Sequence, residues 1–246
     1  MTLPAAFLDR PLAHRGLHGS GTPENSLAAF AAAMDRSYGI ELDVQPSADG
    51  IAMAFHDATL DRLTGRTGPI DVVRADDLTQ TNLADSDEII PRLADVLDLV
   101  AGRAPLLIEI KDRDGALGPG IGPLEDATLA ALDGYDGPVA LMSFNPHSMA
   151  HIAAQAPDRP RGLVTAAFDA CDWPDLPAAT RETLRAIPDA AGVHFISHDS
   201  RDLASPRVAD IRGQGRPILT WTIRSAAEEA AARHIAHNVT FEGYLP

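Results

Sequence analysis

Several polar side chains of this 246-residue chain stand within or directly after short apolar segments. The residues in this position that can do chemistry are His14, Arg15, Glu41, Asp43, His56, Glu109 and Lys111. One residue separates Glu41 from Asp43 and Glu109 from Lys111, so in a strand both members of each pair project from the same face. Because charged groups near apolar strands are costly without partners, these side chains are expected to meet in one site.

The three carboxylates Glu41, Asp43 and Glu109 can converge on one divalent cation. Mg²⁺ and Ca²⁺ select oxygen ligands and tolerate water in their remaining positions. The alternative is a solvated strand face, but the apolar residues on either side of Glu41 and Asp43 argue against exposure. The sequence therefore predicts a site for Mg²⁺ or Ca²⁺.

Two imidazoles, His14 and His56, would be available for acid and base catalysis near neutral pH. Arg15 and Lys111 would add fixed positive charge. Such a set suits a phosphodiester anion, whose cleavage needs charge neutralisation and proton transfer. Structural alternatives exist for each residue: a histidine at a strand end often only satisfies hydrogen bonds, Lys111 can be a rim residue, and Arg15 can pair with a carboxylate.

Short apolar runs alternate along the chain with Ala-rich segments of helical periodicity, a pattern typical of parallel sheets with crossover helices. The runs are Leu12 to His14, Ile40 to Val44, Leu106 to Ile110, Val139 to Met142, Gly162 to Val164, Val193 to Ile196, Ile218 to Thr222 and Val239 to Glu242. Eight strands interleaved with helices in about 250 residues predict a (β/α)8 TIM barrel, with a doubly wound sheet as the alternative. In such a barrel, catalytic groups come from the C-terminal ends of the strands.

Three helices have readable start signals. Asn25 is expected to cap a helix over Ser26 to Met34, Pro91 precedes a helix over Leu93 to Val100, and Ser225 opens an Ala/Glu helix.

One stretch interrupts the alternation of strands and helices. Asp49-Gly50 predicts a tight turn whose return strand runs from Ile51 to Phe55. The polar stretch that follows, at about 57–90, predicts a small insertion on one rim after the second strand. We expect residues 1–246 to form a single domain that includes this insertion.

The order of the motifs along the chain resembles that of the glycerophosphodiester phosphodiesterase family, within the superfamily of phospholipase C-like phosphodiesterases. The motifs are His14-Arg15-Gly16, Pro23 to Phe30, Ile40 to Val44, Asp49-Gly50, His56-Asp57 and Ile108 to Lys111, with thinner matches at Ser143 to Asn145, Trp221-Thr222 and Thr240 to Gly243. The family often has a Thr-Asp pair where this chain has Phe241-Glu242-Gly243, which leaves the role of Glu242 open.

This resemblance implies a TIM-barrel hydrolase that uses a divalent cation to convert glycerophosphodiesters to sn-glycerol 3-phosphate and an alcohol. The roles that it implies are acid/base catalysis by His14 and His56, metal binding by Glu41, Asp43 and Glu109, and phosphate binding by Arg15 and Lys111. Trp221 stands at a strand end, where its side chain can either form a wall for the glycerol moiety or belong to the core. The same two alternatives apply to Phe144. A phospholipase D-like enzyme acting on lysolipids and a non-catalytic phosphate-binding barrel are the alternatives.

The net charge of −15 and the single cysteine narrow the class of protein further. An acidic chain without a basic patch repels nucleic acid and anionic membranes, so the expected partner is a small glycerophosphodiester. Cys171 has no partner for an internal disulfide, and the sequence has neither an apolar leader nor the roughly 20 apolar residues of a membrane span. These features predict a cytoplasmic protein and leave the oligomeric state, the physiological metal and the alcohol group open.

Lys111 is the single lysine among 20 basic side chains, the other 19 being arginine. A compact ammonium beside a cation-bound phosphate is not interchangeable with a guanidinium. We therefore expect Lys111→Arg to lower turnover of a glycerophosphodiester by about tenfold or more, which corresponds to about 1.4 kcal/mol of transition-state stabilisation. A variant with full turnover would show that this position tolerates either basic group.

Overall fold

The computed structural model describes residues 2–84, 86–186 and 192–246, in which parallel strands form a closed barrel. The barrel strands are β1 (Leu12–Ala13), β2 (Gly39–Pro46), β4 (Leu106–Ile110), β5 (Val139–Ser143), β6 (Arg161–Thr165), β7 (Phe195–Asp199), β8 (Ile218–Ile223) and β9 (Asn238–Phe241). Each strand pairs in parallel with the next, and β1 pairs with both β2 and β9. This closure confirms the TIM barrel and excludes the doubly wound sheet.

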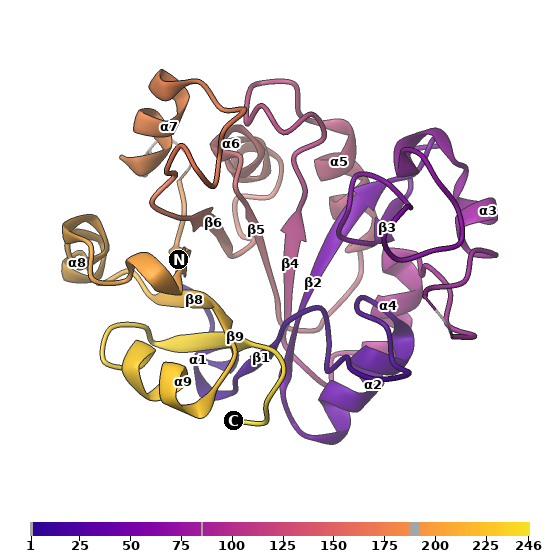
Figure 1. The fold of residues 1–246 in the computed structure, drawn as a ribbon, viewed down its shortest axis with the longest axis horizontal. Helices are drawn as coiled ribbons and strands as arrows, with labels where there is room; N and C mark the ends of the chain where they lie inside the picture. The colour runs from indigo at the N-terminus through magenta and orange to yellow at the C-terminus, as the bar shows by residue number, and fades with distance from the viewer. Residues whose placement is uncertain (1, 85, 187–191) are drawn as a thin grey trace.

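Helices surround the strands, as Figure 1 shows. Their bounds are α1 (Ala6–Asp9), α2 (Leu27–Asp35), α3 (Ala75–Leu78), α4 (Leu93–Val100), α5 (Pro123–Ala131), α6 (Pro146–Gln155), α7 (Ala178–Arg185), α8 (Pro206–Gly213) and α9 (Ala226–Ala232), with 3-10 turns η1 (Ile70–Val72) and η3 (Ser200–Asp202). Within the described ranges, none of these helices combines the length and the hydrophobicity that crossing a bilayer requires.

The predicted helix starts are confirmed at two of three positions. Helix α4 spans Leu93–Val100, and the Ser225 side chain caps α9. The assignment of Asn25 as the cap of α2 is wrong, because the Ser26 hydroxyl accepts the Ala29 amide proton instead. Asn25 has a positive φ of 55° and a buried side chain that points to β2.

Alternation along β2 and β4 divides the side chains between two layers. Leu42 and Val44 pack in the core between strands and helices, whereas Leu107 belongs to the separate apolar cluster inside the barrel. Glu41 is paired in register with Leu107, and Asp43 with Glu109, so these carboxylates share the inner face with Leu107. The barrel interior is therefore apolar toward the strand starts and acidic toward the strand ends.

The expected return strand is β3 (Ala52–Ala54), which pairs with β2 in antiparallel orientation. The chain that follows contains η1 and α3 and lies at one side of the barrel (Figure 1). It has its own apolar cluster, formed by Met53, Phe55, Leu60, Ile70, Ala75, Leu78, Leu83 and Ile90. The Glu88 carboxylate accepts the Ala28 amide proton at 3.0 Å, which ties this segment to α2.

Helix α1 closes the barrel at the end where the strands begin, a feature that the sequence did not reveal. Phe7 and Leu3 belong to the inner cluster with Leu12, Leu107 and Phe195. The side-chain amide of Asn238 donates a hydrogen bond to the Phe7 carbonyl at 2.8 Å, which fixes the helix against β9.

Because the Phe7 ring is fully buried in this cluster, Phe7→Ala should lower the free energy of unfolding by about 3–5 kcal/mol. Urea unfolding followed by circular dichroism measures the loss. Leu245→Ala truncates an exposed side chain and should change the stability by no more than about 0.5 kcal/mol. Equal losses in the two variants would contradict the view that α1 is part of the barrel core.

Candidate functional site

Three buried carboxylates gather at the ends of two neighbouring strands. Glu41 and Asp43 on β2 are 2% and 1% exposed, and Glu109 on β4 is 7% exposed. One oxygen of each lies within 4.8 Å of the others, close enough to hold a single metal ion. Oxygen ligands at the mouth of a barrel suit a hard divalent cation.

Asp43 is the most strongly supported member of this group. Asn25 donates its side-chain amide to Asp43 Oδ2 at 3.0 Å and accepts the Asp43 backbone N–H at 3.2 Å. Lys111 Nζ and Arg15 Nε each lie 3.4 Å from the carboxylate oxygens. Burial alone would raise the pKa of Asp43, but the positive charges of Lys111, His56 and Arg15 hold it well below its usual range.

Glu41 has far less compensation. It accepts the Arg15 backbone N–H at 3.0 Å, and its carboxylate faces those of Asp43 and Glu109. Burial and the two neighbouring carboxylates raise its pKa well above the usual value. Lys111 donates to Glu109 at 2.7 Å; burial alone would lower the lysine pKa, but the charges of Glu109 and Asp43 raise it, so the ammonium stays charged.

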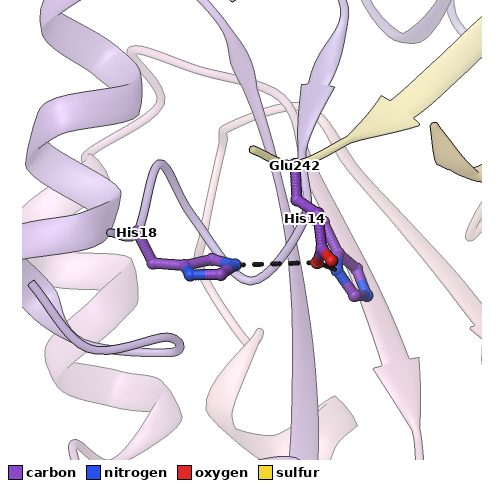
Figure 2. A group of neighbouring side chains, drawn as sticks. All are labelled: His14, His18 and Glu242. Atoms are coloured by element: carbon purple, nitrogen blue, oxygen red, sulfur yellow. Dashed lines mark hydrogen bonds and ion pairs between the residues drawn. The ribbon is translucent and has the colours of Figure 1, made fainter. Parts of the chain in front are cut away.

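His14 follows β1 and is held through one ring nitrogen. Its Nδ1 lies 2.5 Å from Oε2 of Glu242, the residue after β9. Figure 2 shows these two side chains together with His18. Arg224 binds the other oxygen of Glu242, with Nε at 2.9 Å. Because Glu242 occupies Nδ1, Nε2 of His14 is the nitrogen available to the pocket. Burial lowers the pKa of His14, which favours the neutral imidazole.

His56 has a similar arrangement on the other side of the pocket. Its Nδ1 lies 2.7 Å from the carboxylate of Asp57. Arg62, which belongs to the insertion, contacts Asp57 at 2.7 Å and Glu24 at 2.7 Å. Glu24 also accepts a hydrogen bond from Arg15 at 2.6 Å. The insertion thus contributes an arginine that links the loops around both histidines.

An aromatic wall borders the same space. The rings of Phe144 and Trp221 meet edge to face with centroids 5.6 Å apart, and Trp221 Nε1 donates to the Ser197 carbonyl at 3.0 Å. Both rings line a pocket of about 210 Å³. All nine predicted site residues line this pocket, and they are His14, Arg15, Glu41, Asp43, His56, Glu109, Lys111, Phe144 and Trp221.

Several residues that shape the site were not predicted. Asp57 and Asn25 stand within recognisable motifs, but their contacts depend on the fold. The contact of Glu242 with His14 joins residues 228 positions apart. Arg62 and Arg224 carry no local pattern that distinguishes them from other surface arginines.

Comparisons with known proteins agree on one family. A sequence profile of the glycerophosphoryl diester phosphodiesterase family matches residues 14–240. A glycerophosphodiester phosphodiesterase of Caldanaerobacter subterraneus subsp. tengcongensis is 33% identical over 163 residues, which cover 62% of this chain and 65% of that relative. A Bacillus subtilis protein of the same name is 26% identical over 240 residues, covering 88% of this chain and 77% of the relative. The first match thus spans just under two thirds of that relative's length.

Solved structures share the fold. A phosphodiesterase of Oleispira antarctica in complex with the product sn-glycerol-3-phosphate has a TM-score of 0.79 at 24% identity, covering 96% of this chain and 94% of that chain. A glycerophosphodiester phosphodiesterase of Thermotoga maritima has a TM-score of 0.71 at 22% identity, covering 94% and 92% of the two chains.

The raised pKa of Glu41 gives a prediction for thermal stability. A carboxyl group with a raised folded pKa stabilises the fold at low pH, and this contribution is lost as the pH rises through the folded value. At pH 8 and without divalent cations, Glu41→Gln should therefore raise Tm, by about 2–4 °C for each 1 kcal/mol of relieved repulsion. Mg²⁺ or Ca²⁺ should raise Tm of the parent protein and have little effect on the variant, because the variant lacks one ligand.

Differential scanning fluorimetry with and without cation measures both effects. Glu182→Gln, which removes an exposed carboxylate, is the matched control and should behave like the parent. An equal cation-induced rise in the Glu41→Gln variant would contradict the predicted ligand set.

Proposed function

The chain belongs to the glycerophosphoryl diester phosphodiesterase family, and from this premise we propose that it hydrolyses glycerophosphodiesters to sn-glycerol 3-phosphate and an alcohol. The observation that carries the proposal is the convergence of two imidazoles and three buried carboxylates on one pocket. The pocket volume of about 210 Å³ suits a glycerophosphate group. The structural relative from Oleispira antarctica is described with the product sn-glycerol-3-phosphate.

Glu41, Asp43 and Glu109 would hold a divalent cation, Mg²⁺ or Ca²⁺. Their fit is supported by the closeness of their oxygens and by the raised pKa of Glu41, which indicates that the cluster lacks positive charge. A cation bound there would supply charge neutralisation for the phosphoryl oxygens.

Arg15 and Lys111 line the same pocket and would bind the phosphate. Both are already beside Asp43, so they can divide their charge between the carboxylates and the substrate. Phe144 and Trp221 would form the wall along the glycerol moiety.

His14 is assigned as the base of the first step, since its lowered pKa favours the neutral form and its Nε2 carries the free lone pair. It takes the proton of the glycerol hydroxyl beside the phosphate, and that oxygen bonds to phosphorus while the bond to the leaving alcohol breaks. His56, protonated at Nε2, donates its proton to the leaving oxygen. Water then opens the cyclic phosphate with the two roles reversed.

The decisive experiment is an assay with glycerophosphocholine, glycerophosphoethanolamine and glycerophosphoglycerol in the presence of Mg²⁺. Phosphorus NMR should show sn-glycerol 3-phosphate as the final product of at least one substrate. His14→Ala and His56→Ala should each lower turnover by about 10²–10⁴-fold while circular dichroism shows an intact fold. His147→Ala, which removes an exposed imidazole on α6, is the control and should keep full activity.

Other outcomes would identify the alternatives. A cyclic phosphate released from a lysolipid, without hydrolysis of the three diesters, would favour the phospholipase D-like enzyme. Binding of the diesters without turnover of any of them would favour a phosphate-binding barrel. Unchanged activity of either histidine variant would contradict the acid/base assignment.

A further inference from the structure

We propose that His14, His18 and Glu242 form a second cation site, specific for a borderline metal ion such as Zn²⁺, and that its occupation inactivates His14. The inhibitory consequence rests on the function proposed above, whereas the metal site itself stands on geometry. It is separate from the three carboxylates in both residues and donor atoms.

Three donor atoms already face one another at this place. The closest nitrogen or oxygen atoms of His14, His18 and Glu242 lie within 4.8 Å of one another. Figure 2 shows the His18 ring pointing at the Glu242 carboxylate. The His18 Nε2 to Glu242 Oε2 distance is 3.8 Å, and His14 Nδ1 lies 2.5 Å from the same oxygen. The His18 nitrogen is buried and makes no hydrogen bond within the described part of the chain. It is therefore an uncommitted donor aimed at a carboxylate.

The donor set differs in kind from that of the predicted catalytic cation. Two imidazole nitrogens and one carboxylate oxygen favour Zn²⁺ over Mg²⁺ or Ca²⁺, which prefer oxygen ligands alone. Tetrahedral Zn²⁺ with bonds of about 2.0–2.1 Å separates its ligand atoms by about 3.3 Å. The contact between His14 and Glu242 would have to lengthen by several tenths of an ångström and that of His18 to shorten by a similar amount. Small side-chain rotations accomplish both changes.

The surroundings meet two further requirements of a metal site. Arg224 binds Glu242 Oε1 at 2.8 Å, so it orients the carboxylate and leaves Oε2 to the ligand position. The side chains of His14, His18 and Glu242 are 15%, 25% and 22% exposed, which gives an ion a path from solvent and a place for a water ligand.

Occupation of this site changes the tautomer of His14. In the structure, Nδ1 is engaged with Glu242, and Nε2 is free to accept a proton from the attacking hydroxyl. A metal ion on Nδ1 needs the lone pair of that nitrogen, so the single N–H proton of the neutral ring moves from Nδ1 to Nε2 by exchange with solvent. The ring has no lone pair left for the pocket, so His14 cannot serve as the base even with Mg²⁺ or Ca²⁺ in place.

Binding is tested first, without substrate, so that its result does not depend on the proposed activity. Isothermal titration calorimetry with Zn²⁺ in a large excess of Mg²⁺ should detect one site in the intact chain. His18→Ala should weaken Zn²⁺ binding by about tenfold or more, because His18 would bind the ion directly and does not only orient another ligand. His147→Ala, which removes an exposed imidazole elsewhere, should leave the affinity unchanged.

Co²⁺ serves as the spectroscopic probe of the donor set. Co²⁺ bound by nitrogen and oxygen in a four-coordinate site absorbs strongly in the visible range, and this absorption should persist in Glu41→Gln and disappear in His18→Ala. Equal Zn²⁺ affinity of the parent and the His18→Ala variant would overturn the site. Loss of the absorption in Glu41→Gln alone would assign the metal to the carboxylate cluster and equally overturn it.

The inhibitory consequence is tested in the diester assay at saturating Mg²⁺. Zn²⁺ should inhibit the parent protein, and the concentration for half inhibition should rise in His18→Ala by the same factor as the dissociation constant. Each variant is compared with its own rate without Zn²⁺. Tight Zn²⁺ binding at this site without inhibition would contradict the tautomer argument, whereas absence of turnover in every sample would contradict the proposed function and leave the binding result valid.

Discussion

The mutual repulsion of Glu41, Asp43 and Glu109 is the constraint on which the arrangement of this site depends. The parallel pairing of β2 with β4 places Asp43 directly beside Glu109, and alternation along β2 adds Glu41 on the same inner face. Three buried carboxylates cannot all stay ionised without compensation. Arg15 and Lys111 supply two positive charges, which leaves Glu41 as the member with the raised pKa.

This compensation explains why the basic residues of the pocket have carboxylate partners in the structure. Lys111 bridges Glu109 and Asp43, and Arg15 contacts Glu24 and Asp43. A cation bound among the carboxylates would take over part of this role, and the two basic side chains would then have charge available for a phosphate. Cation binding and anion binding are therefore expected to be cooperative. A bound cation neutralises the carboxylates and frees the positive charge of the two basic side chains, and a bound anion in turn neutralises that positive charge.

Local sequence patterns indicate both the barrel elements and the nine residues that line the pocket, so these could be predicted. The patterns are alternating apolar runs, pairs of charged residues at strand ends, and short motifs such as His56-Asp57. The supporting contacts could not be predicted, because they join distant segments. Glu242 meets His14 through closure of the barrel between β9 and β1. Asn25 precedes the helix and is therefore predicted to cap it, because Asn commonly has that function. In the fold its side chain instead bonds buried Asp43, which needs hydrogen-bond donors, and adjacent Ser26 caps the helix.

The net charge of −15 is compatible with binding an anionic substrate because the two effects act over different distances. At physiological ionic strength the Debye length is about 8 Å, so exposed carboxylates elsewhere on the surface are largely screened from the pocket. Inside the pocket, screening is weaker and the nearest groups dominate. These groups include Arg15 and Lys111, and a cation bound by the three carboxylates, as proposed above, would add to their positive charge. A small diester meets only these local charges, whereas an extended polyanion would lie across the acidic surface. Under the proposed function, local positive charge within an acidic chain would therefore favour small phosphodiesters over nucleic acids.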